Sequence, residues 1–87
     1  MALILPVNGI MPVIGNCFLA PNCTIVGDVT LADECSVWFN AVIRGDVNRI
    51  TVGTRTNIQD GAVIHCTFEK AATIIGKNVS KIGRAHV

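Results

Sequence analysis

Residues 19–48 read LAPNCT IVGDVT LADECS VWFNAV IRGDVN when they are written in groups of six, and this repeat decides the fold. The first position of each group holds a large aliphatic residue: Leu19, Ile25, Leu31, Val37 and Ile43. The fifth position holds a small or apolar residue: Cys23, Val29, Cys35, Ala41 and Val47. Self-similarity at a fixed period is the sequence signature of a repeat architecture.

The same frame continues beyond this stretch. It resumes as VGTRTN, IQDGAV and IHCTFE from Val52, and once more as IGKNVS from Ile75. Insertions at 49–51 and 70–74 separate these groups, and we expect both to loop out of the repeat because the frame is recovered after each. Loops on a rigid scaffold are where function usually concentrates.

A period of six fits neither an amphipathic helix nor a strand that alternates over a long run. It suits a short strand and a turn in each group, with three groups closing a triangular coil whose inward residues stack on those of the next coil. The β-branched residues favour the strands, and Gly, Asn and Asp favour the turns. The sequence therefore predicts an all-β, parallel β-helix of about three coils over residues 19–80, within one domain that spans 1–80.

Composition excludes several classes of partner. The chain has 51% apolar and 15% charged residues and a formal charge of +1, so no electrostatic feature indicates nucleic acid or an anionic membrane. The apolar start MALILPVNGIMPVIG lacks a basic leader, and Pro6, Gly9, Pro12 and Gly15 interrupt it. We expect a cytoplasmic protein without a membrane span. Four cysteines, Cys17, Cys23, Cys35 and Cys66, form no CxxC pair, and we interpret them as reduced residues that fill the core.

The tail KIGRAHV departs from the repeat. The frame requires an inward aliphatic residue at position 81, where the chain has Lys81. The tail also back-translates to AAG ATC GGA AGA GCA CAC GTC, which resembles the start of a common sequencing adapter. We therefore expect residues 81–87 to be a non-native tail, and we do not assign His86 as a metal ligand.

The motifs SVWFNAVIRGDVN, TNIQDGAVIH and TIIGKNVS resemble the γ-class carbonic anhydrase-like proteins of the hexapeptide-repeat superfamily, over essentially residues 5–80. The resemblance implies a left-handed β-helix, here without its C-terminal coils and cap. It also implies a homotrimer, with zinc, or iron in some members, held by three histidines between adjacent subunits. His65 stands four residues beyond QDG, the place of the first ligand. The family's run resembling SIGH and then HGC, which supplies the other two, would begin at Ser80 and is missing.

The resemblance also implies roles for residues around His65. Arg44 and Asp46 correspond to a pair at the subunit interface, and Asp60 to a member of the same network. Gln59 corresponds to the residue that holds the metal-bound water or the substrate, and Asn57 lies in the turn that leads to the site. The frame itself places Arg44, Gln59 and His65 at outward second positions.

For the complete parent protein, the resemblance implies reversible hydration of carbon dioxide to bicarbonate. This chain alone should be inactive, because one histidine is short of the three protein ligands usual in catalytic zinc sites. The segment after His65, CTFEKAAT, offers only Glu69 for proton transfer, which weighs against fast hydration. Two alternatives stay open: a hexapeptide acyltransferase that uses a loop histidine as base, and a trimeric structural or assembly subunit without turnover.

Overall fold

A computed structural model describes residues 1–65, 73–81 and 84–86 of the 87-residue chain. Every regular element among these residues is a strand, and none is a helix long and apolar enough to cross a membrane. The strands are β1 (Leu3–Leu5), β2 (Val13–Ile14), β3 (Phe18–Leu19), β4 (Thr24–Leu31), β5 (Ser36–Val37), β6 (Val42–Val52), β7 (Asn57–Ile58), β8 (Val63–His65), β9 (Thr73–Ile75), β10 (Ser80–Lys81) and β11 (Arg84–His86).

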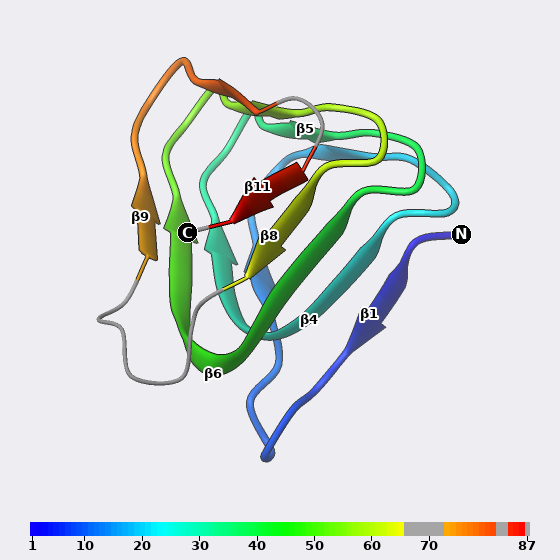
Figure 1. The fold of residues 1–87 in the computed structure, drawn as a ribbon, viewed down its shortest axis with the longest axis vertical. Coiled ribbons are helices and arrows are strands. Elements are labelled where there is room, and N and C mark those ends of the chain that lie inside the picture. Colours follow the sequence, from blue (N-terminus) through cyan, green and yellow to red (C-terminus); the bar gives the residue numbers. More distant parts are fainter. Residues whose placement is uncertain (66–72, 82–83, 87) are drawn as a thin grey trace.

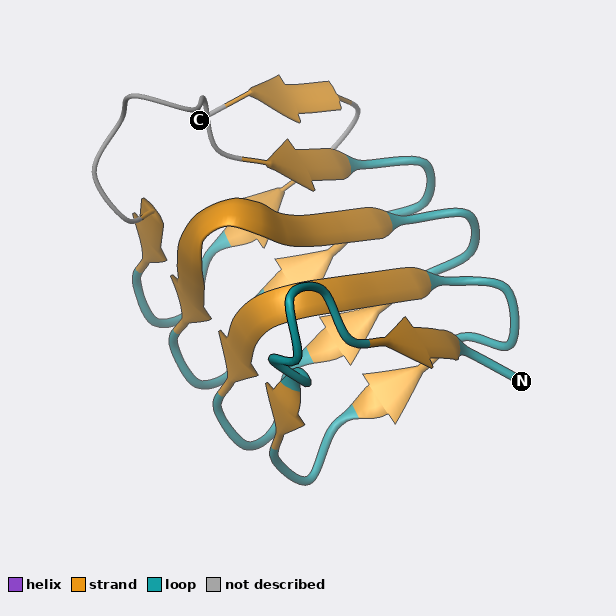
Figure 2. Cartoon of the chain, turned by 90° about the horizontal axis from the view of Figure 1, so that it is seen from below, coloured by secondary structure: helices purple, strands orange, loops and turns teal. Residues whose placement is uncertain are grey.

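All pairings between these strands are parallel, and they stack one coil on the next. One sheet has the order β1-β4-β6-β8-β11, with β2 and β9 paired to the second halves of β4 and β6, and the other has the order β10-β7-β5-β3. The long strands β4 and β6 bend midway, so the coils outline a triangle when viewed along the stack (Figure 1). Figure 2 shows the coils lying above one another. The parallel β-helix of about three coils predicted from the repeat is confirmed.

The core consists of ladders of inward residues. Ile25, Ile43 and Ile64 are register partners on β4, β6 and β8, and each has 0% exposure. Val37 and Ile58 form a second such ladder on the opposite sheet. Burying a side chain of this size contributes about 1.5–3 kcal/mol relative to leaving it exposed. First-position residues of the repeat therefore contribute strongly to the packing between successive coils.

The first insertion does not form the loop at residues 49–51 that we expected. Gly27 pairs with Gly45 and Val29 with Ile50, so residues 46–49 of β6 stand opposite Asp28 alone. The extra residues form a bulge within a continuous strand rather than a loop at 49–51. The bulge turns Val47 outward, 41% exposed, and Ile50 is fully buried in the fifth-position site that we had assigned to Val47. The placement of Val47 at a fifth position of the repeat, equivalent to the buried Val29, was wrong.

Close backbone contact explains why the bulge starts where it does. A Cβ on Gly45 would lie 2.5 Å from the carbonyl oxygen of Asp28, and a Cβ on Gly27 would lie 2.4 Å from that of Gly45. Gly27 also has a φ of 78°, which disfavours other residues. Both strands turn the corner of the triangle at these glycines.

The second insertion is only partly described, because residues 70–72 lie outside the described residues. Thr73 and Ile74, which we had expected to loop out, belong to β9 and pair with Ile50 and Thr51. Ile75 is buried as the frame requires, with 4% exposure.

The tail continues the stack. Lys81 on β10 pairs with Ile58, and β11 pairs with β8, with Ala85 opposite Ile64. The pairing shows that this segment can occupy a further layer. Whether residues 81–87 are native stays a prediction.

The N-terminal segment forms a first layer that the repeat did not reveal. β1 and β2 pair with the two halves of β4, and Val7 and Ile10 form a small antiparallel bridge between them. Asn8 and Gly9 make the turn with positive φ values of 52° and 77°, which suits Asn-Gly. Because this turn contains extra residues, the first layer does not follow the period of six.

The cysteines among the described residues fit the reduced interpretation. Cys23 and Cys35 are buried and Cys17 is half-buried, and all three are free thiols. Burial raises the pKa of the Cys23 thiol, so the neutral form is favoured. Cys66 lies outside the described residues.

Candidate metal-ligating face and its surroundings

His65 lies on the outer face of the sheet formed by β4, β6 and β8. Its strand neighbour Ile64 is fully buried, whereas His65 is half-buried. Its register partner on β6 is Arg44, whose own partner on β4 is Val26. Adjacent strands are about 4.8 Å apart, so His65 and Arg44 start side by side on one outer row. The ligand role of His65 stays a prediction.

Arg44 and Asp46 form an ion pair where β6 enters its bulge. Arg44 Nε is 3.5 Å from Asp46 Oδ2, and the two side chains are 49% and 35% exposed. An ion pair this exposed contributes little to the stability of one chain. Both groups are accessible to another molecule on this face.

Asn57 and Gln59 lie on a different face of the triangle. Asn57 is on β7 in the four-stranded sheet, and Gln59 follows directly after that strand, on the same side as Asn57. Asp60 is exposed at the corner between β7 and β8. The structure thus brings Arg44, Asp46 and His65 to one side of this corner, and Asn57 and Gln59 to the other. The two groups therefore lie on adjoining faces of one chain.

Sequence reasoning missed the contact of Ser36 with Asn57 and the link from Trp38 to Ser36. Ser36 Oγ is hydrogen-bonded to Asn57 Oδ1, and Trp38 Nε1 donates to Ser36 Oγ over 3.0 Å. The sequence signal that could have found Ser36 was its position in the repeat. Ser36 and Asn57 both occupy the sixth position of the repeat, and the structure makes them register partners.

The donor set for a metal is incomplete among the described residues. In residues 1–65, 73–81 and 84–86, no three His, Cys, Asp or Glu side chains come together. A catalytic zinc site usually needs three protein ligands, and His65 would supply one. The described part of one chain therefore does not fit a catalytic metal centre on its own.

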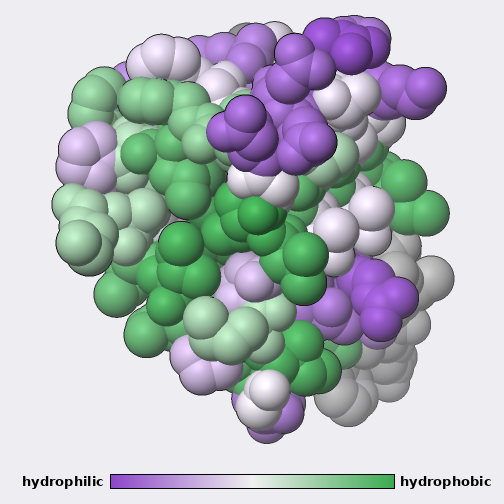
Figure 3. All heavy atoms as spheres, turned by 180° about the vertical axis from the view of Figure 1, so that it is seen from behind, coloured by the Kyte–Doolittle hydropathy of each residue, from purple (hydrophilic) through white to green (hydrophobic). Residues whose placement is uncertain are grey.

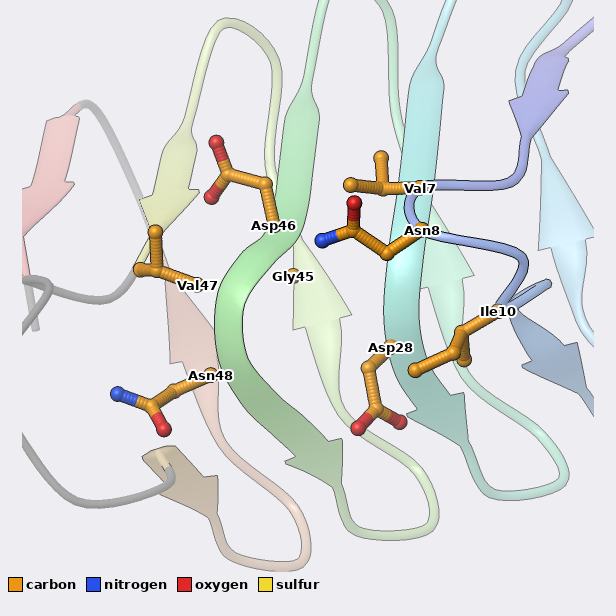
Figure 4. A pocket seen from close by; sticks show the side chains of 8 residues that line it. All are labelled: Val7, Asn8, Ile10, Asp28, Gly45, Asp46, Val47 and Asn48. Carbon is orange, nitrogen blue, oxygen red and sulfur yellow. The ribbon is translucent and has the colours of Figure 1, made fainter.

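A pocket of about 150 Å³ lies beside the bulge (Figure 4). The N-terminal turn contributes Val7, Asn8 and Ile10, and the bulge lies across from it, with Asp28 and Gly45 between them. Asp28 forms an ion pair with Arg49, in which Arg49 Nε lies 3.3 Å from Asp28 Oδ2. The pocket exists because the bulge and the turn both leave the regular wall of the coil.

Known proteins resemble the chain over most of its length. A probable carbonic anhydrase from Methanocaldococcus jannaschii is 54% identical over 65 residues, 75% of this chain and 40% of that protein. A carbonic anhydrase from Geobacillus kaustophilus is 47% identical over 64 residues, 72% of this chain and 35% of that protein. The mitochondrial γ carbonic anhydrase 1 of Arabidopsis thaliana is 41% identical over 75 residues, 80% of this chain and 27% of that protein. The chain belongs to the γ-carbonic anhydrase-like family.

Solved structures agree with membership of the γ-carbonic anhydrase-like family at the level of the fold. A hexapeptide transferase family protein from Anaplasma phagocytophilum has 38% identity and a TM-score of 0.87, with 97% of this chain and 50% of that chain covered. A putative acetyltransferase from Bacillus cereus has 37% identity and a TM-score of 0.88, with 98% and 51% covered. No family model matches the sequence. The chain spans about half the length of these solved chains and less of the curated relatives.

Proposed function

We propose that this chain is part of a trimeric, metal-dependent enzyme that converts carbon dioxide and water to bicarbonate. The observation that carries the proposal is the outer row of β6 and β8, where His65 and Arg44 are register partners beside the bulge that holds Asp46. The similarity of the chain to relatives named carbonic anhydrase, 54% and 47% identical over 65 and 64 residues, supports the proposal. The activity belongs to the complete protein rather than to the described coils.

His65 would supply one imidazole to zinc or iron in this enzyme. The remaining ligands would come from further coils and from a neighbouring subunit, because no three donor side chains come together among the described residues. His86, the register partner of His65 on β11, lies in the tail that we expect to be non-native and is not assigned as a ligand. The metal, when bound, acts as a Lewis acid that makes water nucleophilic near neutral pH.

The other residues of this chain have roles in assembly and substrate binding under this proposal. Arg44 presents a planar group that can form two hydrogen bonds to a carboxylate of a neighbouring subunit, with Asp46 and Asp60 in the same network. Gln59 and Asn57 face outward from the adjoining face, where a neighbour's His65 row can approach them. Trimer formation thus brings together the two groups of residues that one chain keeps apart.

The chain as it stands provides the first test. We expect the 87-residue protein to bind zinc only weakly and to show no hydration of carbon dioxide by stopped-flow measurement. A form that carries the downstream coils should bind zinc stoichiometrically and lose both zinc and activity in His65→Ala. Tight zinc binding by the 87-residue chain, or full activity of His65→Ala in the longer form, would contradict the proposal.

A second candidate function is acyl transfer. The structural neighbours named as a hexapeptide transferase and an acetyltransferase favour it. Such an enzyme would bind an acyl donor along the coils and use a histidine as base. Binding of coenzyme A to the longer form, with no dependence of activity on zinc, would favour this function over hydration.

A further inference from the structure

Trp38, Ser36 and Asn57 form a chain of hydrogen bonds across β5 and β7. Trp38 Nε1 donates to Ser36 Oγ, and Ser36 Oγ bonds to Asn57 Oδ1. Ser36 and Asn57 are register partners, and all three side chains are half-buried on the outer face of the four-stranded sheet. The face is the one that also carries Gln59.

The direction of this chain follows from the chemistry of its members. An indole N–H can only donate, so Ser36 Oγ accepts from Trp38 and keeps its own single proton to donate. That proton requires an acceptor, and an Asn side chain offers its carbonyl oxygen. Oδ1 of Asn57 therefore faces Ser36, and the NH2 group of Asn57 faces away. Among the described residues, that NH2 group donates to no protein atom.

Aromatic contacts hold the start of the chain in place. The ring centroid of Trp38 lies 4.8 Å from that of Phe18 and 6.3 Å from that of Phe39, and both pairs of rings are tilted. Tilted aromatic pairs at these separations are favourable. The indole N–H is thus held toward Ser36 by packing as well as by the hydrogen bond.

We propose that Trp38 and Ser36 are positioning residues that fix the Asn57 amide with its NH2 group outward, as a double donor to the oxygen atoms of a small oxyanion. The proposal deepens the proposed function, on which it rests for the choice of bicarbonate as that oxyanion. Without Ser36, the Asn57 amide could rotate and present its carbonyl oxygen instead, which would repel an anion. With the amide held in this way, this face presents hydrogen-bond donors to a ligand.

The chain supplies a matched control. Asn57 has a serine register partner on each side, Ser36 on β5 and Ser80 on β10. Ser36 is bonded to the Asn57 side chain, whereas no hydrogen bond joins the Ser80 hydroxyl to it. Ser36→Ala and Trp38→Phe should therefore release the amide, Ser36→Thr should keep it, and Ser80→Ala should have no effect.

Nuclear magnetic resonance of the metal-free 87-residue protein tests the orientation directly. Spectra can be recorded in solution or by magic-angle spinning on sedimented protein, so association of the chain does not prevent the measurement. In the wild type, the Asn57 NH2 protons should show exchange with water and no strong contact with the β protons of Ser36. Ser36→Ala and Trp38→Phe should shift the NH2 resonances, and Ser36→Thr should restore them. Strong contacts between the NH2 protons and Ser36 in the wild type, or unchanged spectra in Ser36→Ala, would overturn the proposal.

Titration with bicarbonate separates this inference from the proposed function. In the form that carries the downstream coils, we expect bicarbonate to shift the Asn57 NH2 resonances, with binding weakened about two- to tenfold in Ser36→Ala, the loss typical of one hydrogen bond. A fixed amide that does not respond to bicarbonate would support positioning by Ser36 and contradict the substrate assigned to this face. Equal bicarbonate affinity in Ser36→Ala and the wild type would overturn the positioning role itself.

Discussion

The middle coils and the last described layer have the same repeat but differ in how completely they bury it. In the middle, Ile43 has Ile25 on one side and Ile64 on the other, and all three are fully buried. In the last layer, Ile75 is buried against Val52, but the fifth-position residue Val79 is only half-buried. The inward ladder of Val37 and Ile58 ends at Lys81. A hexapeptide buries its apolar residues fully only when another coil covers it.

The first layer shows the same effect at the other end of the stack. Seven of the ten large apolar side chains exposed among the described residues belong to residues 1–18: Met1, Leu3, Leu5, Ile10, Met11, Val13 and Phe18. The view from behind shows apolar side chains gathered over a broad part of that face (Figure 3). Both ends of the stack are therefore less well covered than its middle, as expected for a solenoid without capping repeats.

The largest expected effect is a gradient of amide protection along the stack. Hydrogen exchange should be slowest at Ile25, Ile43 and Ile64 and much faster in β9 and β10, because edge strands open locally at low free energy. The exposed edges should also make the 87-residue chain associate or precipitate. Size-exclusion chromatography with exchange detected by mass spectrometry checks both points. A monodisperse chain with uniform protection through Val79 would show that three coils are self-sufficient.

A core substitution should show the second largest effect. Ile43→Ala removes a buried side chain between two others and should lower the free energy of unfolding by about 2–5 kcal/mol. Ile74→Ala is the matched control, since its side chain is mostly exposed, and it should change stability by less than about 0.5 kcal/mol. Urea unfolding monitored by circular dichroism distinguishes the two. Similar losses in both variants would contradict the assignment of Ile43 as a core residue and Ile74 as an outward one.

Much of this fold could be predicted from the sequence because inward positions recur at a fixed period. The frame identified Ile25, Ile43 and Ile64 as one ladder from aliphatic character alone. It failed at Val47, where an aliphatic residue at the expected position is exposed. The bulge depends on close contact between the backbones at Gly27 and Gly45, which are in separate coils. Hydrophobic periodicity within one strand carries no information about such a contact.

The candidate site was less predictable than the core. Outward second positions placed His65 and Arg44 on one row, and the structure pairs them. The link from Trp38 through Ser36 to Asn57 was not predicted, because it depends on hydrogen-bond direction between neighbouring coils. Gln59 and His65 lie on two different faces, and predicting this would have required knowing where the corners of the triangle fall. Residue type and spacing indicate which groups are outward but not which groups meet.

A smaller effect should come from the hydroxyl that joins the middle to the last layer. Thr56 is fully buried, and its Oγ1 donates to the Gly76 carbonyl over 2.8 Å and accepts the Val79 N–H over 3.4 Å. Thr56→Val keeps the shape but leaves these groups without partners, which should cost about 1–3 kcal/mol. Thr56→Ser should retain most of the stability. The loss should appear as faster amide exchange at Gly76 and Val79, with Ile43 unchanged, and equal acceleration at Ile43 would contradict this local coupling.

The smallest effect on stability should come from Arg44, although its proposed role is central. Arg44→Ala removes an exposed ion pair with Asp46 and should change the free energy of unfolding of one chain by less than about 1 kcal/mol. Arg49→Ala is the matched control, because Arg49 also pairs with a bulge-side carboxylate, Asp28, and is exposed. In a form of the protein with its downstream coils, Arg44→Ala should weaken the trimer in analytical ultracentrifugation, whereas Arg49→Ala should leave it intact. His65→Ala should remove the metal with a smaller effect on assembly, because an interface built on several polar contacts survives the loss of one ligand. If Arg44→Ala and His65→Ala caused equal loss of both metal and trimer, the separate roles assigned to these register partners would be wrong.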